Sequence, residues 1–333
     1  MRTFTSLAIL AVLALGAAAK AETAPAANPA PEPQAVTGGV WLIPGGIPPR
    51  REPDGNTVIF IGPRGLTVMD TGRHPWHRQA ILDFAAQRKA PVVAIVNSHW
   101  HLDHTGGNAA LKRAYPGAKV YASGAVEGAL KGFLPKSAKD TRDYLASGQA
   151  DPSTAEDLKG DLTVMADPDA LIPDVRIEQD RTLDLGGRRL QAHLARNAAT
   201  AGDVWLYDAA TRTVASGDLV TLPAAFLDTA CPAGWRAALG AIWRTPFRRL
   251  VPGHGPVMDR AMFAAYRSAF GALIDCAAGQ TPKTACGAAW TQAVQPLLGA
   301  SELDRRRAQG MTEDYVDLLR AHGGRSAFCE ASA

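Results

Sequence analysis

The sequence predicts an α/β protein in which two β-sheets pack together under covering helices, with a helical extension at the C-terminal end. Three observations support this fold class. Short β-branched and apolar runs at residues 40–43, 57–61 and 66–69 are separated by Gly, Pro and Asn, as in a meander of strands. Strand and helix patterns recur in two successive halves, which is typical of sheets that share a core. Beyond residue 258 the pattern is helical.

In the first half, a helix and a buried strand follow the meander. Ile81, Leu82 and Ala85 recur with helical spacing after Pro75. Residues 91–96 are continuously apolar, which predicts a strand covered on both faces. A further helix is expected between residues 109 and 115 and a further strand at 119–122.

The second half repeats the strand signals and then becomes helical. Strands are expected at residues 189–194, 204–207 and 213–215. Two apolar stripes with helical spacing follow: Phe263, Tyr266, Phe270, Leu273 and Ile274, then Met311, Tyr315, Leu318 and Leu319. Residues 124–165 are polar, Ala-rich and helix-prone, and their pattern indicates a lid without fixing its geometry.

The N-terminal residues indicate export. A basic start, a short apolar run from Leu7 to Ala19 and a small-residue end predict a signal peptide over residues 1–21, with an uncleaved anchor as the alternative. Residues 22–38 are rich in Pro and Ala and predict an extended tether. We therefore expect a main domain over 39–260 and a helical extension over 261–333, in a periplasmic or secreted protein.

The charge balance excludes some classes of partner. The formal net charge is +3, and removal of Arg2 and Lys20 with the signal peptide reduces it to +1. A mature chain so close to neutral gives no electrostatic reason to expect binding to nucleic acid or to anionic membranes. We expect a small-molecule substrate, and no membrane span once the signal is removed.

The four cysteines fit an oxidising compartment. Their spacing is too wide for a zinc knuckle, so disulfides are favoured. Cys276 and Cys286 bracket a plausible turn between two helices and are expected to pair, which leaves Cys231 for Cys329. The alternative is that one or both pairs stay reduced and buried.

The most informative segment is residues 99–104, His-Trp-His-Leu-Asp-His. Imidazoles and carboxylates are ligands of Zn²⁺ and of similar ions. Three imidazoles so close together would also repel one another in a plain core. The segment follows the predicted buried strand, where a rigid sheet can hold ligands on a loop. The alternative is a His-rich surface loop without a ligand.

Two later segments carry the same kind of residue. Asp218 comes directly after a predicted strand, within Ala-Ser-Gly-Asp-Leu. His254 lies in a Gly- and Pro-rich turn, Pro-Gly-His-Gly-Pro, after another strand. Asp70, at the end of the third strand, is expected to brace the ligand loop by hydrogen bonds, or else to serve only the turn.

With these three motifs in this order, the chain resembles the metallo-β-lactamase superfamily over roughly residues 40–260. The resemblance implies an αββα sandwich with metal ions at one edge of its two sheets. It assigns six metal ligands: His99 and His101 for a first ion, Asp103, His104 and His254 for a second, and Asp218 as the bridge.

One departure from the family pattern concerns the first ion. The family usually offers a further imidazole in a His-Thr-x-Gly-Asp segment, whereas this chain has Ala199 at that position. His193 is a poor substitute, because it lies six residues back along a strand that rises ~3.3 Å per residue. We therefore expect a weakened first site and an intact second one.

The resemblance implies a metal-dependent hydrolase that uses an activated water on an ester, thioester, lactone or amide. Zn²⁺ is the expected ion, with Fe or Mn as alternatives, and Asp103 would both bind the metal and orient the water. Asp218 stands where some lactam-cleaving members carry Cys, so the glyoxalase, lactonase and general hydrolase branches are favoured. Exported relatives of this kind suggest a periplasmic redox system as a partner.

Three other functions remain open from the sequence. They are a β-lactam-cleaving hydrolase, a mononuclear iron oxygenase of the persulfide type, and a metal-binding or partner-binding protein that has lost activity. Nearby aromatic and imidazole residues have simpler explanations. His74 and His77 are expected on a solvated helix start, and Trp100 is expected to point away from the metal and pack in a core.

Overall fold

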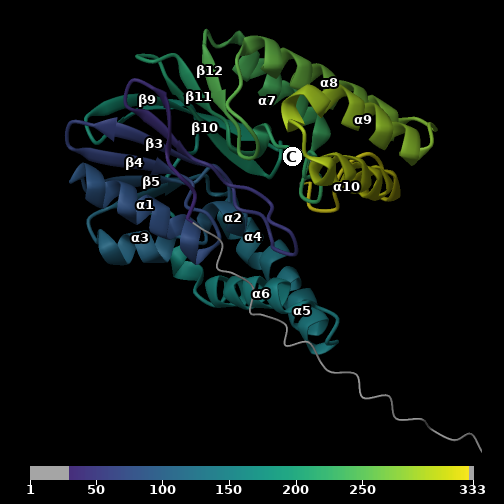
Figure 1. Cartoon of the computed structure of the whole chain (residues 1–333), viewed down its shortest axis with the longest axis horizontal. Coiled ribbons are helices and arrows are strands. Elements are labelled where there is room, and N and C mark those ends of the chain that lie inside the picture. Colours follow the sequence, from purple (N-terminus) through teal and green to yellow (C-terminus); the bar gives the residue numbers. More distant parts are fainter. Residues whose placement is uncertain (1–29, 330–333) are drawn as a thin grey trace, which may run out of the picture.

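The computed structural model describes residues 30–329 and contains two β-sheets packed face to face, with helices on both outer sides (Figure 1). This arrangement confirms the predicted α/β sandwich with a C-terminal helical region. The predicted signal peptide, residues 1–21, lies outside the described residues. Within residues 30–329, no helix combines the length and hydropathy that a bilayer crossing requires.

The first sheet has seven strands in chain order, β1-β2-β3-β4-β5-β6-β7. Antiparallel pairing joins β1 to β4, and parallel pairing joins β4 to β7. The strands are β1 (Gln34–Thr37), β2 (Val40–Ile43), β3 (Thr57–Gly62), β4 (Gly65–Met69), β5 (Val92–Val96), β6 (Lys119–Ala122) and β7 (Val175–Arg176).

The second sheet has five strands in the order β12-β11-β10-β9-β8. Its pairing is antiparallel except between β11 and β12, which run parallel. The strands are β8 (Arg181–Leu185), β9 (Arg188–Arg196), β10 (Gly202–Asp208), β11 (Thr213–Ala215) and β12 (Arg249–Val251).

The helices fall into groups that cover different parts of the sandwich. The α-helices are α1 (Pro75–Arg88), α2 (Leu102–Thr105), α3 (Asn108–Ala114), α4 (Ala125–Lys131), α5 (Phe133–Ala146), α6 (Pro152–Met165), α7 (Pro232–Arg244), α8 (Arg260–Ala278), α9 (Lys283–Leu298) and α10 (Glu302–Ala321). Two 3₁₀ turns complete them, η1 (Pro168–Ala170) and η2 (Gly217–Leu219). The segment that the sequence left open, residues 124–165, therefore forms α4, α5 and α6.

Three apolar cores hold the layers together. The core between the sheets contains Phe60 from β3 and Leu190 and Leu206 from the second sheet. Outside the first sheet, Ile81 and Phe84 of α1 pack over its strands. Burial of side chains of this size contributes about 1.5–3 kcal/mol each, which explains why the apolar runs form the two central layers.

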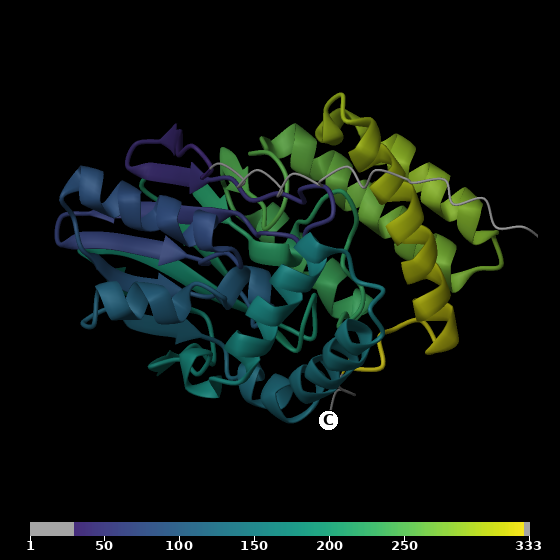
Figure 2. The same cartoon turned by 60° about the horizontal axis from the view of Figure 1, so that its bottom comes forward.

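The C-terminal extension belongs to the third core and is not a separate appendage. Helices α7, α8, α9 and α10 pack together at one end of the molecule (Figures 1 and 2). Trp290 of α9 donates its indole N–H to the carbonyl of Pro223 at 2.8 Å. Arg307 of α10 donates to the carbonyl of Ile47 at 2.6 Å. The boundary predicted at residue 260 is thus a change of secondary structure inside one packed unit.

The predicted tether over residues 22–38 needs a correction at its end. Residues 34–37 form strand β1, which pairs with β2. Composition suggested an extended, unpaired segment, but the edge of β2 offers backbone hydrogen-bond partners to any extended chain that lies beside it. The remaining part, residues 22–29, lies outside the described residues.

Both predicted disulfides are confirmed. Cys231 is bonded to Cys329, and Cys276 is bonded to Cys286 across the α8–α9 turn. The first bond ties the segment after α10 to the loop that precedes α7. Ser326 reinforces this attachment, because its backbone N–H donates to the carbonyl of Ala230 at 3.0 Å.

We predict that the two disulfides contribute unequally to stability. The bonds close loops with sequence separations of 98 and 10 residues, and the loop-entropy estimate is about 4.7 kcal/mol for a 100-residue loop and about 3 kcal/mol for a 15-residue loop. Replacing Cys231 and Cys329 by Ser should therefore lower the free energy of unfolding in urea more than replacing Cys276 and Cys286. The reverse order would contradict this assignment.

Candidate metal centre

The candidate ligands lie on loops that leave the carboxyl ends of parallel strands. Strands β11 and β12 pair in parallel with Ala215 opposite Val251. Asp218 and His254 each follow three residues beyond these partners, so the register places them at the same sheet edge. In the first sheet, β4 and β5 pair in parallel with Met69 opposite Val96, and His99 follows Val96 by the same interval.

Four predicted ligands form one compact group, which we call the four-ligand cluster: Asp103, His104, Asp218 and His254. His254 Nε2 lies 3.0 Å from Asp103 Oδ2, and His104 Nε2 lies 3.1 Å from Asp218 Oδ1. The two Nε2 atoms are 3.3 Å apart. Ligands about 2.0–2.1 Å from a tetrahedral ion are separated by about 3.3 Å. The spacing therefore matches that around a single ion.

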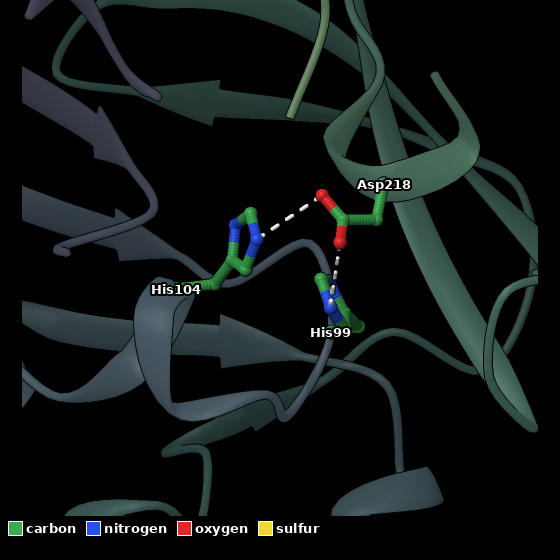
Figure 3. A group of neighbouring side chains, drawn as sticks. All are labelled: His99, His104 and Asp218. Carbon is green, nitrogen blue, oxygen red and sulfur yellow. Dashed lines mark ion pairs between the residues drawn. The ribbon is translucent and has the colours of Figure 1, made fainter. Parts of the chain in front are cut away.

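His99 faces the other oxygen of the bridging carboxylate. Its Nε2 lies 3.7 Å from Asp218 Oδ2, while Oδ1 of the same carboxylate faces His104 (Figure 3). The ligand atoms of His99, His104 and Asp218 all lie within 4.8 Å of one another. Asp218 is thus placed between the four-ligand cluster and His99.

A hydrogen-bond relay from Asp70 fixes the imidazole tautomers. Asp70 accepts from the Ser98 hydroxyl at 2.8 Å and lies 2.8 Å from His104 Nδ1, so His104 carries its proton on Nδ1. Since the Ser98 hydroxyl donates to Asp70, it must accept from His99 Nδ1, 2.9 Å away. Both imidazoles therefore present unprotonated Nε2 atoms to the cluster. The predicted bracing role of Asp70 is confirmed.

The structure does not bring His101 into either group of ligands. His101 Nε2 lies 3.2 Å from the Thr229 hydroxyl, and that hydroxyl donates to the carbonyl of Ala199 at 2.9 Å. A hydroxyl has one proton, so Thr229 must accept from a protonated His101 Nε2. That nitrogen then has no lone pair for a metal. The residue that lacks an imidazole, Ala199, supplies the carbonyl that anchors this alternative.

The described cluster has unsatisfied polar atoms that a cation would satisfy. Asp218 Oδ1 and Oδ2 and His99 Nε2 are buried without a hydrogen-bond partner. Burial lowers the pKa of His104, but the carboxylates of Asp218 and Asp103 outweigh burial and raise it well above its usual value. Positive charge is therefore stabilised at the centre of the cluster, and the donor set fits a borderline divalent ion.

Two glycines allow the ligands to approach this closely. A Cβ at Gly253 would lie 2.0 Å from Asp218 Oδ1, and one at Gly55 would lie 2.4 Å from the imidazole of His104. Any larger residue at either position would displace a ligand. This explains the glycine that precedes His254 in the Pro-Gly-His-Gly turn.

A cavity of about 460 Å³ opens next to the cluster. His101, Leu102 and Asp103 form its floor, α5 and α6 form one wall, and Met311 and Tyr315 of α10 form another. Trp100 is buried among Val126, Leu134 and their neighbours, as predicted, while an edge of it also reaches the cavity. The sequence gave no signal that Tyr315 or the neighbouring loop residue Asp228 would reach the site.

The expectation that His74 and His77 are solvated was wrong. Both are buried: His74 Nδ1 lies 2.6 Å from Asp54 Oδ2, and His77 Nε2 lies 2.8 Å from the Thr57 hydroxyl. Burial opposes protonation of His74, but hydrogen bonds to Asp157 and Asp54 raise its pKa to about 9. The α1 start packs against α6 and the 44–56 loop, so these imidazoles are structural.

Arg73 connects this buried network to the four-ligand cluster. Its guanidinium forms an ion pair with Asp161 of α6 and lies 4.0 Å from Asp103 Oδ1. It also donates to the carbonyl of Pro53 at 3.0 Å. The non-cluster oxygen of Asp103 thus faces a fixed positive charge.

Comparison with known proteins agrees with this geometry. The sequence profile of the metallo-beta-lactamase superfamily matches residues 51–254. The chain belongs to the metallo-beta-lactamase superfamily. Among solved structures, a metallo-beta-lactamase from Pontibacter korlensis aligns with a TM-score of 0.52 at 21% identity, covering 72% of this chain and 98% of that one. The sec-alkylsulfatase Pisa1 from Pseudomonas sp. aligns with a TM-score of 0.59 at 19% identity, covering 86% and 49%.

Curated relatives of this superfamily member match over short segments. A hydroxyacylglutathione hydrolase from Synechococcus sp. (strain JA-3-3Ab) is 45% identical over 58 residues, 17% of this chain and 23% of the relative. An atrochrysone carboxyl ACP thioesterase from Aspergillus fumigatus is 33% identical over 89 residues, 26% of this chain and 28% of the relative. The matched segments therefore span about a quarter of these relatives.

We predict that the isolated protein retains nearer one equivalent of divalent metal than two after dialysis, because His101 is hydrogen-bonded away from the first site. Metal analysis by mass spectrometry measures this directly. Combining Ala199→His with Thr229→Val should restore an imidazole, release His101 and raise the stoichiometry towards two. Two retained equivalents in the unaltered chain would contradict the prediction.

We predict a pH-dependent contribution to stability from Asp203, whose buried carboxylate accepts from the Thr200 backbone N–H at 2.9 Å. Burial raises its pKa to about 7. The folded state therefore binds this proton more tightly than the unfolded state, and the contribution is present in full below pH ~4 and lost as pH rises through about 7.

The amide variant Asp203→Asn tests this contribution. Relative to the unaltered chain, it should be more stable at pH 8 than at pH 5, by up to about 4 kcal/mol for three pKa units. Chemical denaturation of both proteins at the two pH values provides the measurement, and titration of other groups cancels in the difference. An equal effect of the substitution at both values would refute the assignment.

Proposed function

We propose that the protein is a metal-dependent hydrolase that attacks an ester, thioester, lactone or amide with water. The observation that carries this proposal is the convergence of Asp103, His104, Asp218 and His254 on one ion-sized position at the floor of a cavity. Buried carboxylates are costly unless they are paired or coordinate a metal. A cavity beside them gives a substrate access to whatever chemistry the ion supplies.

The metal would be held by the four-ligand cluster, with His99 as a further contact to the bridging carboxylate. When bound, an ion of this class lowers the pKa of a coordinated water to about 7 and polarises carbonyl oxygens. Zn²⁺ fits the nitrogen and oxygen donors, and Fe or Mn are alternatives.

The chain's own residues would orient the reacting groups. Asp103 presents Oδ2 to the cluster and Oδ1 to Arg73, so its carboxylate is held in one orientation and can accept a proton from a water on the cavity side. Arg73 is itself fixed by Asp161 and by the Pro53 carbonyl. Trp100 and Phe133, whose ring centroids are 5.0 Å apart, help to exclude bulk water from the floor.

The names of the relatives support hydrolysis of an acyl bond. They include a hydroxyacylglutathione hydrolase and a thioesterase. An aspartate at the bridging position agrees with such branches better than with the lactam-cleaving members that carry Cys. We therefore place thioesters and esters first and β-lactams second.

We also propose that the protein acts outside the cytoplasm. The signal-like residues 1–21 and the two disulfides support export, since disulfides persist in oxidising compartments. A periplasmic redox system remains the proposed context for a partner.

A non-catalytic metal-binding role is the second candidate. It is favoured by one specific observation, the hydrogen bond that holds His101 away from the first site. A binding protein of this kind would retain the four-ligand cluster without turning over any acyl substrate.

We predict metal-dependent turnover in a panel of thioesters, esters, lactones and a β-lactam, each assayed after reconstitution with Zn, Fe or Mn. Replacing Asp103 by Asn should lower kcat at least 100-fold, because the variant loses both a charged ligand and a proton acceptor. Release of thiol or acid provides the readout.

The control is Asp83→Asn, which removes an exposed carboxylate of α1 and should leave kcat unchanged. Tight metal binding without turnover of any panel member would contradict the hydrolase and support the binding protein. Oxygen consumption with the iron form in place of hydrolysis would support the oxygenase alternative.

A further inference from the structure

The charged groups around the cavity are unevenly paired. The two arginines that line it, Arg51 and Arg73, are each held by a carboxylate. Arg51 donates to Asp157 at 2.6 Å, and Arg73 is paired with Asp161. No Lys is among the described residues that line this cavity. Neither arginine therefore offers an uncompensated positive charge to a substrate.

Two carboxylates at the same cavity have no such compensation. Glu52 and Asp228 line it, and neither forms an ion pair with a cation among residues 30–329. The two ligand carboxylates, Asp103 and Asp218, would be offset by a divalent ion. The remaining balance facing the cavity is two negative charges.

Asp228 is fixed at the position where it can act on a substrate. It precedes Thr229, whose hydroxyl contacts His101, and its backbone carbonyl accepts from the hydroxyl of Ser326. Across the cavity stands Tyr315 of α10. Burial raises the pKa of the Tyr315 hydroxyl well above its usual value, and the charge of Asp228 adds to this effect. Tyr315 thus stays a neutral hydrogen-bond donor.

The rest of the cavity wall is apolar and partly aromatic. The side chains that could contact an acyl or alkyl group are Trp100, Phe133, Leu134, Leu158, Phe226 and Met311. Aromatic faces beside carboxylates attract organic cations as well as neutral apolar groups. An anionic group would lose water here without gaining a free cation as partner.

We propose that this cavity binds apolar substrates that are neutral or positively charged and discriminates against anionic ones, with Asp228 and Glu52 as the specificity-determining residues. The substrate class deepens the hydrolase function proposed above and rests on it. A glutathione conjugate, which carries carboxylates, would be disfavoured, so this chain differs in specificity from the relative named for such a substrate.

A matched series of ligands tests the proposal without requiring turnover. Three S-alkyl thioethers with the same alkyl group carry a trimethylammonium, an acetamide or a carboxylate on an ethyl arm of the same length. Their binding to the zinc-loaded protein is measured by calorimetry. We expect the cation to bind about 10-fold more tightly than the anion, with the neutral ligand between them and the difference shrinking at high salt.

Charge-removing variants locate the effect. Asp228→Asn and Glu52→Gln should each reduce the cation-to-anion ratio about 3-fold, whereas Asp83→Asn should leave it unchanged. Equal or tighter binding of the anion, or no binding of any ligand in the series, would overturn the proposal. So would an equal loss of preference in the Asp83→Asn control.

The corresponding thioesters distinguish this proposal from the proposed function. Cation-selective binding of the thioethers without hydrolysis of any thioester would refute the hydrolase and leave the specificity standing. Hydrolysis at equal kcat/KM across the three charges would refute the specificity and leave the hydrolase standing.

Discussion

The constraint on which this structure depends is the burial of two carboxylates among imidazoles at the edge of the sandwich. Asp103 and Asp218 are each less than 5% exposed, and both oxygens of Asp218 lack a hydrogen-bond partner among the described residues. Isolated buried charges are strongly unfavourable, and a pair of like charges more so. A cation held between them removes this cost, and the surrounding geometry is arranged to hold one.

The scaffold positions the cluster through backbone pairing and a few close contacts. Parallel pairing of β11 with β12 brings Asp218 and His254 to one edge, although they are distant in sequence. The Asp70–Ser98 relay orients the imidazoles of the other loop. The helical extension then completes the cavity, since Tyr315 lies on α10 and the Cys231–Cys329 bond attaches the segment after that helix to the loop that carries Asp228. The extension is therefore part of the site's architecture.

Local patterns in the sequence predicted the sandwich and the candidate ligands, because strand periodicity and the His-Trp-His-Leu-Asp-His spacing are local signals. The placement of His101 was not predictable in the same way. It depends on the Thr229 hydroxyl and the Ala199 carbonyl, which come from two other loops. The burial of His74 depends similarly on Asp54 and Asp157, which approach only after α6 has packed against α1. Spacing identifies residues capable of chemistry, whereas tertiary packing decides which of them face the same atom.

The most direct test of this account is a crystal structure of the zinc-loaded protein with anomalous scattering data at the zinc edge. The account predicts one strong peak within about 2.0–2.2 Å of His104 Nε2, His254 Nε2 and an Asp103 oxygen, with Asp218 as a further ligand and His101 still bonded to Thr229. A peak away from these atoms, or none at saturating zinc, would contradict the account.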